Sequence, residues 1–187
     1  VFTGRERFEP GNPQEGYSPS PQERQSWLQI SYMKEAYHTM GPKFTLGWMA
    51  EALYSSKNFS ENYTATMMQA GEFAPTPHSK LMYNEAFRAN QYVAAGIKPI
   101  YVLNDMFQFR TEFYGFTPIF PIKKNALNKA YYGKAFSRFE YMGEVSVICH
   151  LPFGAISAYV NHYSSPRREW NVGMTIGWQL FNYRFVE

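Results

Sequence analysis

The end of the chain constrains the fold more than any other stretch, because two kinds of side chain alternate along residues 170–185. They read W-N-V-G-M-T-I-G-W-Q-L-F-N-Y-R-F, with apolar residues at Val172, Met174, Ile176, Trp178 and Leu180 and small or polar ones between. A period of two predicts a β-strand with one apolar face and one polar face. Such a strand would extend roughly 50 Å at about 3.3 Å per residue, whereas strands of soluble domains average about 5 or 6 residues. This length argues against an ordinary sandwich.

The final aromatic residues of the same stretch, Phe181, Tyr183 and Phe185, alternate in the opposite phase. Either a bulge near Leu180 shifts the register, or an aromatic cluster caps the inner end of the strand. The pattern leaves both arrangements open.

Composition excludes one kind of membrane protein and leaves another open. Aromatic side chains make up 19% of the 187 residues, yet the mean hydropathy is −0.43 and no run of about 18 apolar residues occurs, which excludes a transmembrane helix. A transmembrane β-barrel stays compatible, because polar residues facing its lumen dilute the hydropathy of those facing lipid. The 18 basic and 15 acidic residues are interspersed, so no nucleic acid is expected as a partner.

Two internal stretches repeat the alternating pattern. In residues 44–54 the apolar side begins with Phe44 and ends with Tyr54, as expected for aromatic girdles around a lipid-facing band. In residues 107–113, phenylalanines and one threonine alternate with Gln108, Arg110 and Glu112. These polar residues suit a wet lumen, although a soluble sheet with one solvated face explains them equally well.

The rest of the chain divides into a leading segment and a series of strands. Residues 1–25 are rich in proline, glycine, serine and charge and predict a linker or loop, followed by a β-barrel segment over residues 26–187. Periodicity predicts an all-β fold, an antiparallel up-and-down meander of about eight long strands that forms part of an outer-membrane β-barrel. The predicted strands lie at residues 27–38, 44–54, 63–69, 89–103, 107–113, 139–151, 155–163 and 170–185.

The predicted connections alternate roughly between short and long. Long ones at 71–85 and 118–134 fall outside, and short ones near Asn104 and Pro152 fall on the periplasmic side, as in outer-membrane barrels. The turn at Gly41-Pro42 breaks this scheme, because it is short on the outer side.

Few side chains are arranged for chemistry. The single cysteine, Cys149, excludes an internal disulfide, and the four histidines lack metal-ligand spacing, so neither a metal nor a cofactor is expected. A candidate polar lumen network consists of charged residues that project to one side of the predicted strands: Glu51, Arg110, Glu112, Glu140 and Glu144. Paired carboxylates could also act on a substrate, but salt bridges are the commoner outcome and no nucleophile accompanies them. The G-x-S-x-G elbow of a serine hydrolase is absent from the sequence.

Two longer runs carry a family resemblance: A-P-T-P-H-S-K-L-M-Y-N-E-A-F-R-A-N-Q-Y-V-A-A-G at residues 74–96 and F-R-T-E-F-Y-G-F-T-P at residues 109–118. They resemble the C-terminal barrel region of patatin-like outer-membrane phospholipases. Those barrels are similar to the sixteen-strand bacterial surface-antigen barrels, which assemble or translocate proteins. The resemblance covers most of residues 26–187 and implies a place in the outer membrane of a Gram-negative bacterium.

The same resemblance implies partners and site residues. The partners are outer-membrane lipid, the barrel-assembly machinery and an upstream half of the same polypeptide. The last strand, with Phe181, Tyr183 and Phe185, would carry the assembly signal. In that family a long external loop folds into the lumen and carries an Arg-Gly-aromatic motif. Here Arg88 matches the arginine, but Ala89 stands where the glycine would be.

These observations predict a membrane-embedded part of an outer-membrane barrel that anchors or translocates an N-terminal, patatin-like lipase domain outside this chain. The chain itself is not expected to be an enzyme, and any serine lipid acyl hydrolase activity would belong to the parent protein. The competing prediction is a soluble β-barrel or sandwich that binds a small apolar ligand inside. The two differ in which face of the sheet is dry. Without an upstream half, residues 26–185 are expected to form an open, curved meander.

Overall fold

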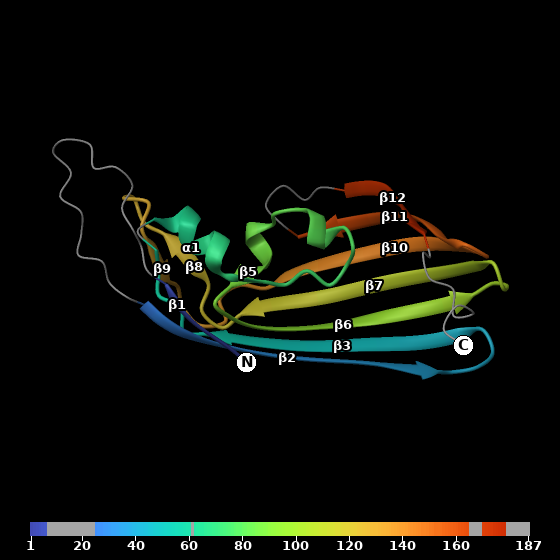
Figure 1. The fold of residues 1–187 in the computed structure, drawn as a ribbon, viewed down its shortest axis with the longest axis horizontal. Helices are drawn as coiled ribbons and strands as arrows, with labels where there is room; N and C mark the ends of the chain where they lie inside the picture. Colours follow the sequence, from blue (N-terminus) through green and yellow to red (C-terminus); the bar gives the residue numbers. More distant parts are fainter. Residues whose placement is uncertain (7–24, 61, 165–169, 179–187) are drawn as a thin grey trace.

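The computed structural model describes residues 1–6, 25–60, 62–164 and 170–178. Within these residues, eight strands form one antiparallel sheet in the order β1-β2-β3-β6-β7-β10-β11-β12, which confirms the predicted all-β meander. The sheet is not closed, and β1 and β12 form its two edges (Figure 1). The strands are β1 (Phe2–Glu6), β2 (Gln25–Thr39), β3 (Phe44–Ser55), β6 (Gln91–Val102), β7 (Phe107–Pro118), β10 (Glu140–Leu151), β11 (Gly154–Tyr163) and β12 (Trp170–Trp178).

Two sequence predictions about the elements are wrong. Residues 2–6 form β1 and pair with the start of β2, although a linker or loop was predicted for residues 1–25; residues 7–24 lie outside the described residues. The strand predicted at residues 63–69 is helix α1 (Tyr63–Gln69). The helix forms because the Asn62 side chain accepts a hydrogen bond from the Ala65 backbone N–H, which caps its first turn. In so short a stretch, alternation and helical periodicity are hard to tell apart.

The connections between the strands differ sharply in length at the two ends of the sheet. Residues 40–43, 103–106 and 152–153 make short turns at one end, here called the short-turn end. The described long connections, residues 56–90 and 119–139, lie at the other, long-loop end (Figure 1). Because residues 63–69 are not a strand, the turn at Gly41-Pro42 falls at the short-turn end. The prediction that this turn breaks the alternation of short and long links is therefore wrong.

Residues 56–90, here called the inserted segment, pack onto one face of the sheet, which we call the inner face. Besides α1, the segment contains β4 (Gly71–Glu72), the short 3-10 helices at Ser79–Leu81 and Glu85–Phe87, and β5 (Arg88–Ala89). Its Phe73 ring stacks on Phe116 at a centroid distance of 5.8 Å and meets Tyr114 edge-on at 6.0 Å. Phe87 packs on the same Phe116 at 5.6 Å. The main hydrophobic core thus lies between the inserted segment and the inner face.

A β-hairpin in residues 119–139, made of β8 (Ile122–Lys124) and β9 (Ala130–Tyr132), packs against α1 at the long-loop end. Ile122 forms a second, smaller core with Tyr63, Met67 and Ala70 of the inserted segment. The Tyr63 backbone N–H also donates a 2.8 Å hydrogen bond to the carbonyl of Asn128. The hairpin and the inserted segment therefore form one layer over the end of the sheet.

On the inner face, aromatic rings lie over glycines of the neighbouring strand. Each described pair is directly opposite in the strand register: Trp27 with Gly4, Tyr37 with Gly47, Tyr114 with Gly96, and Tyr159 with Gly173. A Cβ atom at any of these glycines would collide with the ring. The absent side chain gives the ring a place to lie flat and lets the sheet curve toward its inner face.

Replacing Gly96 by alanine is expected to lower the free energy of unfolding by about 1 to 3 kcal/mol, because the new Cβ overpacks against the Tyr114 ring. The matched control is Gly143→Ala, where the nearest atoms to the new Cβ are 3.7 Å away. Urea unfolding of both variants measures the difference. Equal stability of the two variants would contradict the packing role of Gly96.

Candidate functional site

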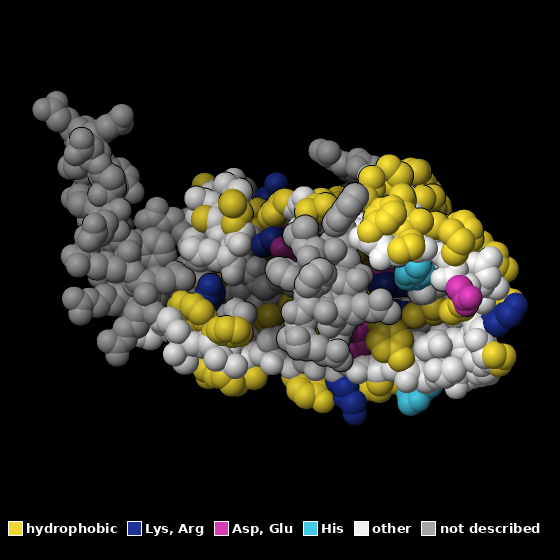
Figure 2. All heavy atoms as spheres, turned by 45° about the vertical axis from the view of Figure 1, so that its right-hand side comes forward, with side chains coloured by type: hydrophobic (Ala, Val, Ile, Leu, Met, Phe, Trp, Pro, Cys, Tyr) yellow, Lys and Arg dark blue, Asp and Glu magenta, His cyan; other side chains and the backbone are white. Residues whose placement is uncertain are grey.

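The opposite face of the sheet, the outer face, is apolar and uncovered by any described residue. Figure 2 shows hydrophobic side chains gathered over the strand ends beside the short turns, with charged side chains in the hollow next to them. Large exposed hydrophobic residues extend over this face from β2 to β12: Ile30, Tyr32, Tyr54, Val93, Ile97, Tyr101, Phe109, Phe113, Val145, Val160, Val172, Met174 and Ile176. Soluble proteins rarely expose a continuous apolar surface of more than a few hundred Å². An apolar surface of this extent is typical of a face that contacts a membrane or a partner.

Aromatic residues mark both ends of the outer face. At the short-turn end, Phe44, Tyr101 and Phe109 lie side by side in the register of β3, β6 and β7. At the long-loop end, Tyr54 and Tyr141 occupy outer-face positions on β3 and β10. Rings with one apolar and one polar end favour the boundary between hydrocarbon and water.

The outer face is least apolar on β2, next to the edge strand β1. Lys34 places its Nζ 5.6 Å from the centroid of the Trp48 ring, and Trp48 Nε1 donates a 3.4 Å hydrogen bond to His38 Nε2. Trp48 thus contacts both polar side chains, and its ring interacts favourably with the lysine charge.

Charged residues on the inner face form buried ion pairs. Lys98 of β6 pairs with Glu35 of β2, and Arg110 pairs with Glu112 two residues later on β7. The side chains of Lys98 and Glu112 are only 7% and 1% exposed. The Tyr114 hydroxyl also donates a hydrogen bond to Glu112. Buried charges need such partners, because an unpaired ion inside a protein costs several kcal/mol.

Glu144 extends this inner-face network to β10. It lies directly opposite Glu112 in the strand register, and Asn161 Nδ2 of β11 lies 3.5 Å from its Oε2. Arg110 Nε and Asn161 Oδ1 have no hydrogen-bond partner among the described residues. Two facing carboxylates, next to side-chain atoms that lack a hydrogen-bond partner, are compatible with an interior that contains water.

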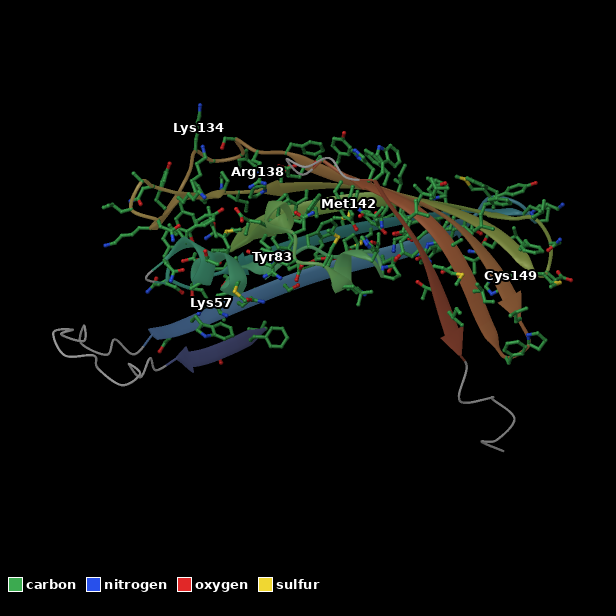
Figure 3. All side chains as sticks on the ribbon, turned by 90° about the horizontal axis from the view of Figure 1, so that it is seen from above. Lys57, Tyr83, Lys134, Arg138, Met142 and Cys149 are labelled. Atoms are coloured by element: carbon green, nitrogen blue, oxygen red, sulfur yellow. The ribbon has the colours of Figure 1, made fainter. Side chains whose placement is uncertain are left out.

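Arg88 links the end of α1 to the rest of the inserted segment. Its guanidinium donates to Glu72 Oε2 at 2.5 Å and to the carbonyl oxygens of Met68 and Ala70 at 3.1 and 3.4 Å. These carbonyls lie at the C-terminal end of the helix, where backbone acceptors lack a helical partner. The guanidinium carbon also lies 4.8 Å from the ring centroid of Tyr83, which Figure 3 labels. All of these partners belong to the inserted segment, so these contacts of Arg88 stabilise the fold of that segment.

His78 connects the inserted segment to β11 of the sheet. Its Nδ1 lies 2.9 Å from the Tyr163 hydroxyl, and its ring centroid is 5.6 Å from that of Tyr159. Burial lowers the pKa of His78 below its ordinary value of 6.5. Nothing in the local sequence predicts this contact, because the two partners are 85 positions apart.

The inserted segment is expected to dock more weakly as the pH falls below 6.5, the ordinary pKa of His78. Because the docked imidazole has the lower pKa, its full stabilising contribution is present above 6.5 and is lost as the pH falls through the lowered value. Tyr159 and Tyr163 of β11 lie against this ring. Limited proteolysis of residues 56–90 over a pH series measures the effect. His78→Gln should remove the pH dependence and His150→Gln should retain it; an unchanged dependence in His78→Gln contradicts the assignment.

The structure places all five residues of the predicted lumen network on the inner face. Glu51 accepts a 2.6 Å hydrogen bond from the Tyr92 hydroxyl, and Glu140 accepts one of 2.7 Å from Arg138 Nε. Glu112 and Glu144 come together with Arg110, whereas Glu51 and Glu140 have these other partners. Lys98 and Glu35 were not predicted as members of this network, although both stand at inward positions of alternating strands. The predicted assembly residues Phe181, Tyr183 and Phe185 lie outside the described residues.

Two further observations concern the described part of the chain. No helix there is long and apolar enough to cross a membrane. No group of three or more His, Cys, Asp and Glu residues there could hold a metal ion.

These features define the class of the protein as an open, antiparallel all-β sheet with an apolar outer face and a charged inner face partly covered by an inserted segment. A scan against protein-family models, a search of curated proteins and a search of solved structures found no match to this chain.

Proposed function

We propose that this chain is the membrane-embedded C-terminal part of an outer-membrane β-barrel that anchors or translocates an N-terminal, patatin-like lipase domain. The observation that carries the proposal is the distribution of side chains across the sheet. The outer face is apolar and no described residue covers it, and the inner face holds ion pairs with buried members. Lipid on the outside and water on the inside match this distribution. A soluble barrel with an apolar ligand inside would need the reverse.

The dimensions of the sheet support the proposal. The strands β3, β6, β7 and β10 contain 12 residues each. At about 3.3 Å per residue and a tilt of about 45°, such a strand rises roughly 28 Å, close to the hydrocarbon thickness of about 30 Å. The strands are therefore long enough to cross the bilayer.

The connections support an orientation in the outer membrane of a Gram-negative bacterium. Barrels of that membrane have short turns on the periplasmic side and long loops outside. We therefore assign the short-turn end to the periplasm and the long-loop end, with the inserted segment and the hairpin, to the cell exterior.

The two edges of the sheet support a larger barrel. Within the described residues, β1 and β12 each pair on one side only. An edge in lipid leaves backbone N–H and C=O groups without partners, at a cost of several kcal/mol for each group. An upstream half of the same polypeptide, joined to both edges with help from the barrel-assembly machinery, would remove this cost.

In this proposal the chemistry belongs to the N-terminal domain. Serine lipid acyl hydrolysis needs an activated nucleophile, and this chain has no G-x-S-x-G elbow. The role of the present chain is to hold that domain at the membrane or to carry it across.

Membrane fractionation of cells that express the full-length protein tests the proposal. We expect the protein in the outer-membrane fraction, resistant to carbonate extraction, with faster gel migration before boiling than after. A closed barrel keeps its compact form in detergent until it is heated, which produces this shift. Recovery of a folded monomer in buffer without detergent would contradict the proposal.

A further inference from the structure

The charged residues of the hairpin region at the long-loop end are all positive. Residues 119–139 contain no acidic residue and have positive charges at Lys123, Lys124, Lys129, Lys134 and Arg138. Arg138 pairs with Glu140, and Lys124 Nζ lies 5.8 Å from the ring centroid of Tyr63. The remaining lysines, Lys123, Lys129 and Lys134, are exposed and form no ion pair with a described residue. We call these three lysines the basic hairpin surface.

Exposed apolar side chains accompany the basic hairpin surface. Leu127, at the tip of the hairpin, is 78% exposed, and Phe136 is 62% exposed. Phe139 packs over Gly115, with its ring 3.0 Å from the position a Cβ would take there. Gly115 is an outer-face position of β7, so the apolar outer face continues into the base of the hairpin.

The position of the lysines relative to the outer face decides which partner fits. In Figure 3, Lys134 points away from the inserted segment, and Cys149 lies at the far end of β10. The described short turns at that far end carry one lysine, Lys43, and one aspartate, Asp105, so they have no net charge. Aromatic rings at the edge of an apolar band, with lysines just beyond it, match the layer of lipid headgroups.

We infer that the basic hairpin surface binds the phosphate groups of anionic lipid headgroups in the outer leaflet, an inference that rests on the proposed function. Lysine ammonium groups bind phosphate as point charges, and each lysine close to an anionic membrane surface strengthens the association. Leu127 and Phe136 enter the interface beside the headgroups. A soluble polyanion would use the same lysines but would gain nothing from these two apolar side chains.

Lipid binding by the full-length protein in nonionic detergent tests the inference. Phosphatidic acid or phosphatidylcholine is added to the micelles, and native mass spectrometry counts the lipid molecules retained. We expect phosphatidic acid to be retained and phosphatidylcholine to be lost. The double variant Lys123→Gln/Lys134→Gln should bind phosphatidic acid roughly 10- to 30-fold more weakly. The control Lys43→Gln/Lys80→Gln loses the same charge elsewhere and should bind like the original protein.

Several results would overturn the inference. Equal affinity of the two double variants for phosphatidic acid would remove the role of the hairpin. Equal retention of phosphatidylcholine would remove the role of the phosphate charge. Displacement of the lipid by an equal concentration of inorganic phosphate would assign the surface to soluble phosphate.

Folding and the proposed function are checked in the same preparations. If Lys123→Gln/Lys134→Gln lost its heat-dependent migration, Lys123→Arg/Lys134→Arg would take its place and should keep phosphatidic acid binding. A roughly tenfold rise in salt should then weaken that binding in the original protein, and insensitivity to salt would overturn the inference. If the protein fractionates with outer membranes but the two double variants bind phosphatidic acid equally well, only this inference is refuted. A protein that never enters membranes refutes the proposed function.

Discussion

In the proposed membrane-embedded barrel, Val145→Arg is expected to destabilise the sheet by about 2 to 4 kcal/mol and to reduce outer-membrane assembly strongly. Val145 is in the middle of β10 on the outer face, where it is 53% exposed and lies opposite Thr111 and Val160. An arginine there would place its charge near the middle of the hydrocarbon layer. The heat-modifiable fraction of the protein and urea unfolding in lipid vesicles measure the two effects.

The control for Val145→Arg is His150→Arg on the same strand. His150 is an exposed inner-face position near the short-turn end, so the same charge would meet water and should change assembly little. Val145→Leu should also be tolerated, because it keeps the outer face apolar. Equal assembly of Val145→Arg and His150→Arg would show that the two faces have been assigned the wrong way round.

Arg110→Ala is expected to cost about 3 to 5 kcal/mol of folding free energy, because it leaves a buried carboxylate without its ion pair. Glu112 is 1% exposed, and Glu144 lies opposite it in the register, so removal of the arginine also leaves two carboxylates facing each other. Urea unfolding in vesicles measures the loss. Replacing Arg110 and Glu112 together by methionine should restore much of the stability, since the Glu112 charge is then removed together with its partner.

Arg138→Ala is the matched control for Arg110→Ala. The Arg138–Glu140 pair has the same spacing in sequence and an arginine of similar exposure, but its carboxylate is 12% exposed, against 1% for Glu112, and also accepts a hydrogen bond from the Ser164 hydroxyl. Removal of Arg138 should therefore cost less, about 1 kcal/mol, because Glu140 keeps this hydrogen bond and some contact with solvent. Similar losses for the two arginine variants, or additive effects at positions 110 and 112, would contradict a coupled pair on the inner face.

Strand alternation predicted which side chains face outward, because each strand has a period of two and one face is almost free of charge. Phe44, Trp48 and Tyr54 on β3 and Phe107, Phe109 and Phe113 on β7 lie on the outer face, as their spacing requires, whereas Phe116 of β7 faces the inner core. The same spacing placed Arg110 and Glu112 together on the inner face. These positions depend only on local geometry, which is why the sequence was sufficient.

The wrong and missing predictions concern residues whose structure depends on tertiary contacts and not on the local sequence pattern. The strand predicted at residues 63–69 is helical because Asn62 caps it and its apolar residues pack on the hairpin. The role of Arg88 depends on a fold of the inserted segment that brings helix carbonyls to its guanidinium. The contact between His78 and Tyr163 depends on how the inserted segment crosses the sheet. No short-range rule contains this information.

The most direct test of the account places single spin labels along residues 44–55 of β3, in a protein whose only cysteine, Cys149, has been replaced by serine. In lipid vesicles, collision with oxygen reports exposure to hydrocarbon, and collision with a water-soluble nickel complex reports exposure to water. We expect strict alternation, with high oxygen and low nickel accessibility at Leu46, Ala50 and Ala52 and no oxygen preference at the inner positions between them. Nickel accessibility at Leu46, Ala50 and Ala52 equal to that of a soluble loop would contradict the claim that the outer face lies in lipid.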